Sequence, residues 1–326
     1  MNTSKNTLSM AEFAETVKEN VLTHLPEDYQ GRKVRIDEIV KEGDRKLTGL
    51  TLIKEGCSTA PVLYINSFYE MYEDGCTESD VLDAIAETYV KIQTENPQQF
   101  TIPDLSYENV KPLLRVSVVY DRANSKLLER LVSVPIGCGY SLIAWLELGD
   151  LMFDGATIKI TRDIFEKFDV SEGQFFKDAL EASAQENPAT LLSLLDAMMT
   201  AAGGEKSANI LDGEMPDHEH DILVLTSKDR FSGASALFYP GMAERIAEIM
   251  GGSFFVIPSS VHEVLIKPDD GSMSPLELAR MVKTVNDEAV SPSERLGNRV
   301  LYYDEEAKTL SVAYDLDKEE RKTAVC

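Results

Sequence analysis

The sequence predicts an α+β fold with mostly antiparallel sheets, helices packed on one face, and two lobes. Strand-like segments follow one another with few β-α-β crossovers, which favours antiparallel pairing over a doubly wound parallel sheet. The stretch 203–221 lacks apolar periodicity and is rich in Gly, Asp and Glu, which is typical of a linker or long loop. The predicted organisation is an N-terminal α+β region over 1–202, this linker over 203–221, a C-terminal α+β region over 222–314 and a charged tail over 315–326.

The N-terminal region begins with an expected helix, because Ser9 and Glu12 form a capping-box pattern and apolar residues follow at helical spacing until Pro26. A turn containing Gly43 and Asp44 between two β-rich runs predicts a hairpin. The remaining helices and strands rest on the same kinds of signal. We expect strands at 34–40, 47–53, 62–65, 114–120, 138–148 and 156–160, and helices at 67–73, 78–93, 107–110, 125–131, 163–168, 172–184 and 189–201.

The C-terminal region alternates pairs of strands with single helices. Its clearest helix starts at Pro275, because Ser274 and Glu277 form a second capping-box pattern and proline suits the first helical position. A helix over 240–250 is stopped by two glycines. We expect strands at 222–226, 234–238, 254–257, 261–266, 300–303 and 310–314.

The charge of the chain excludes several classes of partner. The sequence carries 32 basic and 56 acidic residues, for a formal net charge of −24. Such a field repels nucleic-acid phosphates and anionic membrane surfaces, so neither partner is expected. Two interpretations stay open: the charge maintains solubility, or it forms an acidic face that docks a basic partner or mimics DNA.

The location and chemistry of the protein are predicted by what the sequence lacks. It has no apolar stretch of the ~18 residues that a membrane span requires, and its first residues lack the apolar core of a secretory signal. Its four cysteines are scattered and form no CxxC pair. No P-loop or dinucleotide fingerprint occurs. We therefore expect a cytoplasmic protein without a cofactor.

Two segments resemble a known family. These are a YExYxxG-type stretch, YEMYEDG at 69–75, and a YPG…PSSxHEV stretch between 239 and 264. With neighbouring segments they are similar to an uncharacterised bacterial family, a domain of unknown function common in gut anaerobes related to Clostridia. The resemblance covers almost the whole chain. It implies a bacterial source and a cytoplasmic setting, and it supplies no reaction, cofactor or catalytic residue.

The best polar cluster is Ser260, His262 and Glu263. Alternation along a strand would place Ser260 and His262 on one face, where the imidazole would act as base for the hydroxyl if a carboxylate orients its other nitrogen. However, the G-x-S-x-G elbow is absent. The alternative interpretation is a turn between two strands whose polar groups are satisfied by neighbours.

Two further groups are candidates. Asp217, His218 and His220 place potential metal ligands close together, although zinc sites usually draw ligands from separated elements or from helical H-E-x-x-H pairs. The alternative is a solvated acidic linker. Tyr69 and Tyr72 belong to an aromatic group that indicates either core packing or a protein-binding patch.

The sequence therefore supports one leading hypothesis and one competitor. The leading hypothesis is a non-enzymatic cytoplasmic bacterial protein that acts by binding a protein or a small ligand. The competitor is a hydrolase that uses Ser260, His262 and Glu263, or a metal-dependent activity near His218 and His220. A cleft that holds His262 beside a carboxylate would favour the enzyme, and exposed Tyr69 or Tyr72 would favour binding.

Overall fold

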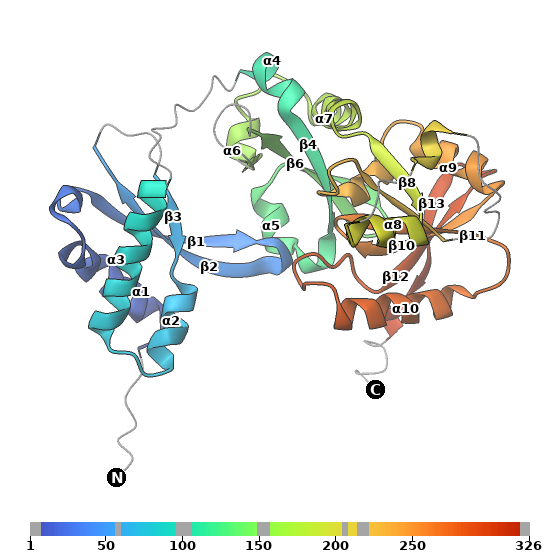
Figure 1. The fold of residues 1–326 in the computed structure, drawn as a ribbon. Coiled ribbons are helices and arrows are strands. Elements are labelled where there is room, and N and C mark those ends of the chain that lie inside the picture. Colours follow the sequence, from blue (N-terminus) through green and yellow to red (C-terminus); the bar gives the residue numbers. More distant parts are fainter. Residues whose placement is uncertain are drawn as a thin grey trace, which may run out of the picture. The chain divides into compact units, whose positions relative to one another are not determined.

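The structure, a computed structural model, describes residues 8–55, 60–95, 106–148, 157–203, 208–213 and 222–319. The chain divides into two compact units, the first formed by Met1–Lys41 with Arg45–Asp104 and the second by Glu42–Asp44 with Leu105–Cys326. Every strand pair among the described residues is antiparallel (Figure 1). The predicted α+β class with antiparallel sheets is confirmed.

The first unit combines a three-stranded sheet, in the order β1-β2-β3, with three of the described α-helices. Its elements are α1 (Met10–Asn20), β1 (Lys33–Lys41), β2 (Arg45–Ile53), β3 (Val62–Tyr64), α2 (Asn66–Glu73) and α3 (Glu78–Glu95). Leu50 and Leu52 of β2 are fully buried in one cluster with Phe13 of α1 and Ile85 of α3. The helices and the sheet therefore share one apolar core of their own.

The second unit holds two sheets and seven of the described α-helices. Its first elements are α4 (Tyr107–Val110), β4 (Leu114–Tyr120), α5 (Ser125–Arg130), β5 (Ser133–Gly137), β6 (Tyr140–Glu147), β7 (Thr157–Lys159), α6 (Arg162–Phe165) and α7 (Glu172–Glu186). The others are β8 (Ala189–Ser193), α8 (Leu194–Ala201), β9 (Leu223–Ser227), α9 (Met242–Met250), β10 (Phe254–Ser260), β11 (Glu263–Pro268), α10 (Pro275–Glu288), β12 (Arg299–Asp304) and β13 (Thr309–Asp315).

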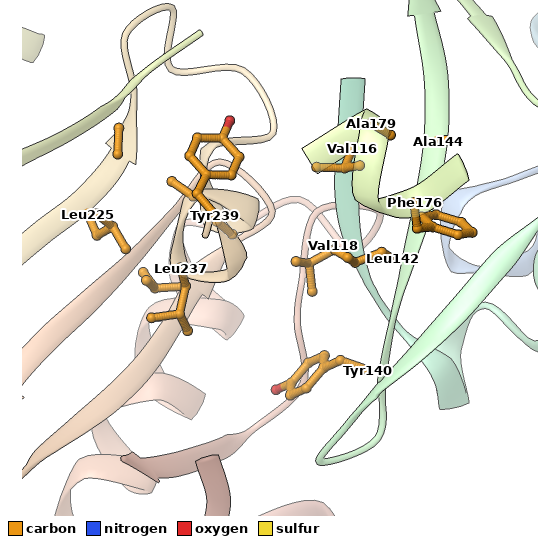
Figure 2. Packing of buried hydrophobic residues seen from close by; sticks show 14 of the residues in the cluster. Val116, Val118, Tyr140, Leu142, Ala144, Phe176, Ala179, Leu225, Leu237 and Tyr239 are labelled. Atoms are coloured by element: carbon orange, nitrogen blue, oxygen red, sulfur yellow. The ribbon is translucent and has the colours of Figure 1, made fainter. Parts of the chain in front are cut away.

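The main core of the second unit lies between its two sheets. In the smaller sheet β6 pairs with β4, β5 and β7, and the larger sheet has the order β13-β12-β10-β11-β9-β8. Figure 2 shows Val118 and Tyr140 from the smaller sheet on one side of this core, with Leu225 and Leu237 on the other. On its opposite face the larger sheet packs against α10 through a separate apolar cluster.

One predicted helix, 189–201, begins in the structure as a strand. β8 occupies Ala189–Ser193 and pairs with β9, and only the second part of the range forms α8. Leu191 and Leu192 point to opposite faces of the strand and are both buried, so both faces of β8 are covered at this point. A short continuous apolar run fits a buried strand and a buried helix equally well, so the pattern alone did not distinguish them.

A predicted strand, 234–238, is also wrong, because Gly233–Phe238 forms a 3₁₀ helix. Ser232 just before it has φ 55°, a left-handed conformation that turns the chain away from an extended path. The small side chains of Ala234, Ser235 and Ala236 are buried there. Side chains of this small size allow the 3₁₀ helix to pack closely against its surroundings. A strand at the same place would need neighbouring strands as partners for its backbone hydrogen bonds.

The predicted division at 203–221 differs from the structure. β8 precedes that stretch and β9 follows it, yet they are neighbouring strands of one sheet. Asn209, inside the expected linker, bonds to β8: its Oδ1 accepts from the Leu191 N–H at 2.9 Å and its Nδ2 donates to the Ala189 carbonyl at 3.1 Å. The composition of a stretch indicates its polarity but not which strands pair on either side of it. The main boundary between the two units lies at Asp104–Leu105.

The predicted charged tail, 315–326, is structured at its start. Asp315 is the last residue of β13, and Asp317 accepts hydrogen bonds from the Asn298 N–H at 3.1 Å and the Tyr120 hydroxyl at 3.3 Å. A carboxylate that accepts from partly buried donors in this way belongs to the folded structure rather than to a solvated tail. Among the described residues, no helix has both the length and the apolarity needed to cross a bilayer.

Asp44 stabilises the second unit by capping α5. Its carboxylate accepts from the N–H groups of Lys126 (3.0 Å) and Leu127 (3.0 Å) and from the Ser125 hydroxyl (3.0 Å). Partial burial raises the pKa of Asp44, but these donors outweigh it and hold the pKa below its ordinary 3.8. The bonded anion supplies acceptors to the otherwise unpaired N–H groups of a helix start.

Asp44→Ala is therefore expected to lower the free energy of unfolding by about 1–2 kcal/mol near neutral pH. Because the folded pKa is depressed, this stabilisation is present above pH 3.8 and is lost as the pH falls further, so the difference from wild type should vanish there. Urea unfolding followed by Trp145 fluorescence measures it. Asp37→Ala removes a carboxylate from an exposed ion pair with Arg35 and should change stability by less than about 0.5 kcal/mol. A constant difference down to pH 2 would contradict the assignment.

Candidate functional site

His262 lies in the turn between β10 and β11, where segments distant in the sequence meet. Its Nδ1 accepts the backbone N–H of Ser232 at 3.3 Å. Its Nε2 lies 3.7 Å from Oε1 of Glu294, and its ring lies 5.6 Å from the ring of Phe231. The imidazole side chain is one-third exposed. The structure thus places His262 between a backbone amide and a carboxylate at the surface of the second unit.

Ser260 and Glu263 do not form the predicted catalytic pair with the imidazole. The Ser260 hydroxyl accepts the backbone N–H of His262 at 3.0 Å, so it serves the turn itself. The carboxylate beside the ring belongs to Glu294, whose carbonyl is held by the Val261 N–H at 2.9 Å. Glu263 is instead the first residue of β11, opposite Ser260 in the register. The alternative interpretation of these residues, a turn with satisfied polar groups, describes this arrangement better.

The contacts of His262 limit its chemistry. Because Nδ1 accepts a backbone N–H, its lone pair is occupied, and in the neutral ring the proton lies on Nε2 facing Glu294. A general base needs a free ring nitrogen within hydrogen-bond reach of the hydroxyl that it deprotonates. The geometry therefore favours a structural imidazole over a nucleophile–base pair.

The loop that carries Ser232 is held in a strained conformation. Arg230 and Ser232 have φ values of 61° and 55°, which non-glycine residues adopt infrequently. The Asp229 carboxylate accepts from the Phe231 N–H at 2.8 Å and from the Ser227 hydroxyl at 2.9 Å, which fixes the loop. Strain of this kind persists only where surrounding contacts hold it in place.

The hydroxyl of Ser232 belongs to a buried network. It accepts from the Ser117 hydroxyl at 2.7 Å, and Ser117 accepts from the Trp145 indole N–H at 3.0 Å. The half-exposed Phe231 ring meets Trp145 edge to face at 5.4 Å. Ser232 thus joins the smaller sheet to the loop, which accounts for its position without a catalytic role.

The structure brings no metal site together among the residues that it describes. Asp217, His218 and His220 lie outside the described residues, so their hypothesis stays a prediction. Among residues 8–55, 60–95, 106–148, 157–203, 208–213 and 222–319, no group of three or more His, Cys, Asp or Glu side chains is placed to hold an ion.

Tyr69 and Tyr72 pack inside the first unit. Their rings lie 5.4 and 5.7 Å from the ring of Phe13 on α1, and the Tyr69 hydroxyl donates to the Leu8 carbonyl at 2.8 Å. Both side chains are half-buried. These contacts favour the core-packing interpretation over the binding patch.

A pocket in the main core of the second unit is apolar. It is lined by Val118, Tyr140, Ala234, Leu237, Phe238, Val256, Pro258, Val264, Leu296 and Leu301. The Tyr140 hydroxyl already donates to the Leu296 carbonyl at 2.7 Å. Ligand sites usually combine apolar walls with a few free polar groups that orient the ligand. This pocket lacks them, which weakens the small-ligand hypothesis.

The most unusual surface is on α8. Leu194, Leu195, Met198 and Met199 are 39%, 68%, 63% and 53% exposed, and none of residues 194–200 is buried. A surface helix normally turns its apolar side chains toward the core. We call these four residues the α8 patch.

Sequence reasoning missed the partners of His262 and the exposure of α8. Ser232 and Glu294 each lie about thirty residues from His262, and no local pattern signals such a contact. The pattern of the α8 patch was visible as two Leu and two Met at spacings i, i+1, i+4 and i+5. A pattern of this kind predicts an apolar face, but not whether that face is covered.

The fold and these features define an α+β protein with an exposed apolar helix and a structural histidine at a strand turn. The chain matches the sequence model of DUF5688, a family of unknown function, over residues 10–305, and it belongs to this family. The predicted resemblance to a family without assigned chemistry is thereby confirmed. No curated protein and no solved structure matches the chain.

Proposed function

We propose that this protein acts by binding another protein through the α8 patch and performs no catalytic step of its own. A bacterial source and a cytoplasmic setting are part of the proposal. The family resemblance supports the source. The unpaired thiols of Cys76 and Cys138 are compatible with a reducing compartment.

The exposure of the α8 patch is the observation that carries the proposal. Four large apolar side chains on a helix of eight residues form a continuous stripe in contact with water. Covering a half-exposed Leu or Met contributes about 1–2 kcal/mol each, so the patch favours association with a complementary surface. Clusters of large apolar residues are typical of the centre of protein interfaces.

The hydrolase hypothesis has weaker support. The Ser260 hydroxyl accepts from a backbone N–H, and the Nδ1 of His262 is occupied by the amide of Ser232. An acyl-transfer site requires the serine hydroxyl to donate to a free ring nitrogen, and the amide of Ser232 already occupies Nδ1 of His262. Small-ligand binding has weaker support as well, because the core pocket lacks orienting polar groups.

The double variant Leu195→Gln/Met198→Gln is expected to lose binding to the physiological partner by about 100-fold or more, because two central apolar contacts are removed. A photoreactive residue at position 199 of the full chain, activated in cells, identifies the partner by its covalent adduct. Affinity for the purified partner is then measured by calorimetry. The melting temperature should stay unchanged, since both side chains are exposed.

Met281→Gln/Val285→Gln is the matched control. These two residues are 40% and 44% exposed on α10, also one helical turn apart. This control should bind the partner normally. Equal affinity of the α8 variant and wild type, or the absence of a reproducible adduct from position 199, would contradict the proposal.

A further inference from the structure

We infer that the partner of the α8 patch is a basic amphipathic helix of another protein, with an apolar face flanked by Lys or Arg. The inference rests on the proposed function and specifies its partner. It combines the shape of the patch, the charge around it and the polarity of α8.

The shape of the patch suits another helix. At about 100° per residue, the spacing i, i+1, i+4 and i+5 confines all four side chains to an arc of about 140°. Such a stripe complements the apolar face of a second amphipathic helix. Met198 and Met199 are unbranched at Cβ and flexible, so they adapt to different side chains across the interface.

The charge around the patch favours a cation. α8 contains one charged residue, Asp196, and no basic residue in its last turn. The negative end of the helix dipole is therefore not neutralised by a residue of that turn. The chain as a whole carries −24, so approach of a basic segment is favoured at long range.

The same charge disfavours the other occupants. A second copy would bring a net charge of −24 against −24, so the two chains would repel each other at long range. Anionic membranes and nucleic acids are repelled for the same reason. A basic helix gains from both the apolar stripe and the field around it.

The test uses the full chain and three labelled peptides of about 18 residues, long enough for several helical turns. The first has a Leu/Met face flanked by Lys, the second has the same face flanked by Glu, and the third has the composition of the first in a scrambled order without an apolar face. Fluorescence anisotropy at physiological salt measures each affinity. We expect the amphipathic Lys peptide to bind at least about tenfold more tightly than either of the others.

Variants connect this binding to α8. Leu195→Gln/Met198→Gln should weaken binding of the amphipathic Lys peptide by about tenfold or more, and Met281→Gln/Val285→Gln should leave it unchanged. Equal binding of the scrambled Lys peptide, or of the Glu peptide, would overturn the inference. The proposed function would stand in that case if the α8 variant still lost its cross-linked partner.

Two other outcomes also decide the matter. If the α8 variant changes neither peptide affinity nor cross-linking, both the inference and the proposed function fail. If light scattering detects a dimer that the α8 variant dissociates, α8 is covered by a second copy and the inference is wrong.

Discussion

Replacing Arg299 by methionine is expected to lower the free energy of unfolding by about 3–5 kcal/mol. Arg299 lies on β12 and is 7% exposed. Its guanidinium donates to the Asp315 carboxylate at 2.8 Å, to the Tyr120 hydroxyl at 3.0 Å and to the Cys138 carbonyl. One side chain thus connects both sheets of the second unit with the turn between β5 and β6.

The cost arises mainly from what the substitution leaves behind. Asp315 is largely buried, and without Arg299 its carboxylate loses its ion-pair partner. The guanidinium also stacks on the rings of Tyr120 and Tyr140, at 4.7 and 5.5 Å from their centroids, and a methionine lacks the positive charge that these rings attract. Arg299→Lys keeps a charge but loses the planar fork, so it should also destabilise the protein.

Trp145 makes the measurement specific, because the chain has a single tryptophan and it is buried in the second unit. Its fluorescence during urea unfolding therefore reports on the unit that holds Arg299. Arg245→Met, which breaks an exposed ion pair with Glu248, should cost less than about 1 kcal/mol. Arg299→Met/Asp315→Leu should recover part of the loss, since it removes both buried charges. A loss below about 1 kcal/mol in the single variant would contradict this role of Arg299.

Features whose causes lie within a few residues could be predicted from the sequence. The two capping boxes, Ser9 with Glu12 and Ser274 with Glu277, form as expected because each joins residues three positions apart. The hairpin of β12 and β13 and the hairpin with its turn at Glu42–Asp44 also follow from local alternation and turn residues. The α+β class could be predicted from the order of these helices and strands alone.

Features whose causes lie far apart in the sequence could not be predicted. The strand β8 is a strand because β9 pairs with it, and neither periodicity nor composition indicates that partner. The same holds at the candidate site, where the nitrogens of His262 face Ser232 and Glu294 rather than the adjacent Ser260 and Glu263. The sequence singled out this histidine, but the polar groups that contact its ring come from residues distant along the chain.

The bend at Cys138 shows the same limit. A strand was expected from 138, but Gly137, Cys138 and Gly139 all have positive φ and β6 begins at Tyr140. Gly137 and Gly139 adopt the positive φ of this bend without the steric cost that other residues would incur. That Arg299 would hold this turn through the Cys138 carbonyl required a residue from β12 that no nearby pattern reveals.

A methyl group at position 233 is expected to destabilise the second unit by about 3 kcal/mol. Gly233 begins the 3₁₀ helix beside the His262 turn. A Cβ there would lie 2.3 Å from the Thr226 Oγ1, 2.4 Å from the His262 carbonyl oxygen and 2.5 Å from the Ser227 backbone nitrogen. Two of these atoms belong to the backbone of hydrogen-bonded segments, so no side-chain rotation relieves the clash.

Relief of the clash would have to break specific bonds. The His262 carbonyl accepts from the Thr226 hydroxyl at 2.8 Å, and the N–H of Ser232, next to Gly233, donates to the His262 ring. Moving Gly233 away from β9 therefore costs hydrogen bonds as well as packing. The Gly233→Ala variant should show this in urea unfolding monitored by Trp145, which lies beside the same loop.

Gly173→Ala provides a control for which we expect the free energy of unfolding to rise rather than fall. A Cβ at Gly173 meets no atom within 4 Å, and the residue lies in the first turn of α7, where alanine is the better helix former. We expect this variant to gain up to about 1 kcal/mol. If Gly233→Ala proved as stable as wild type, the 3₁₀ helix would not be packed against β9 and the turn. The contacts assigned to His262 would then lose the support on which its structural role depends.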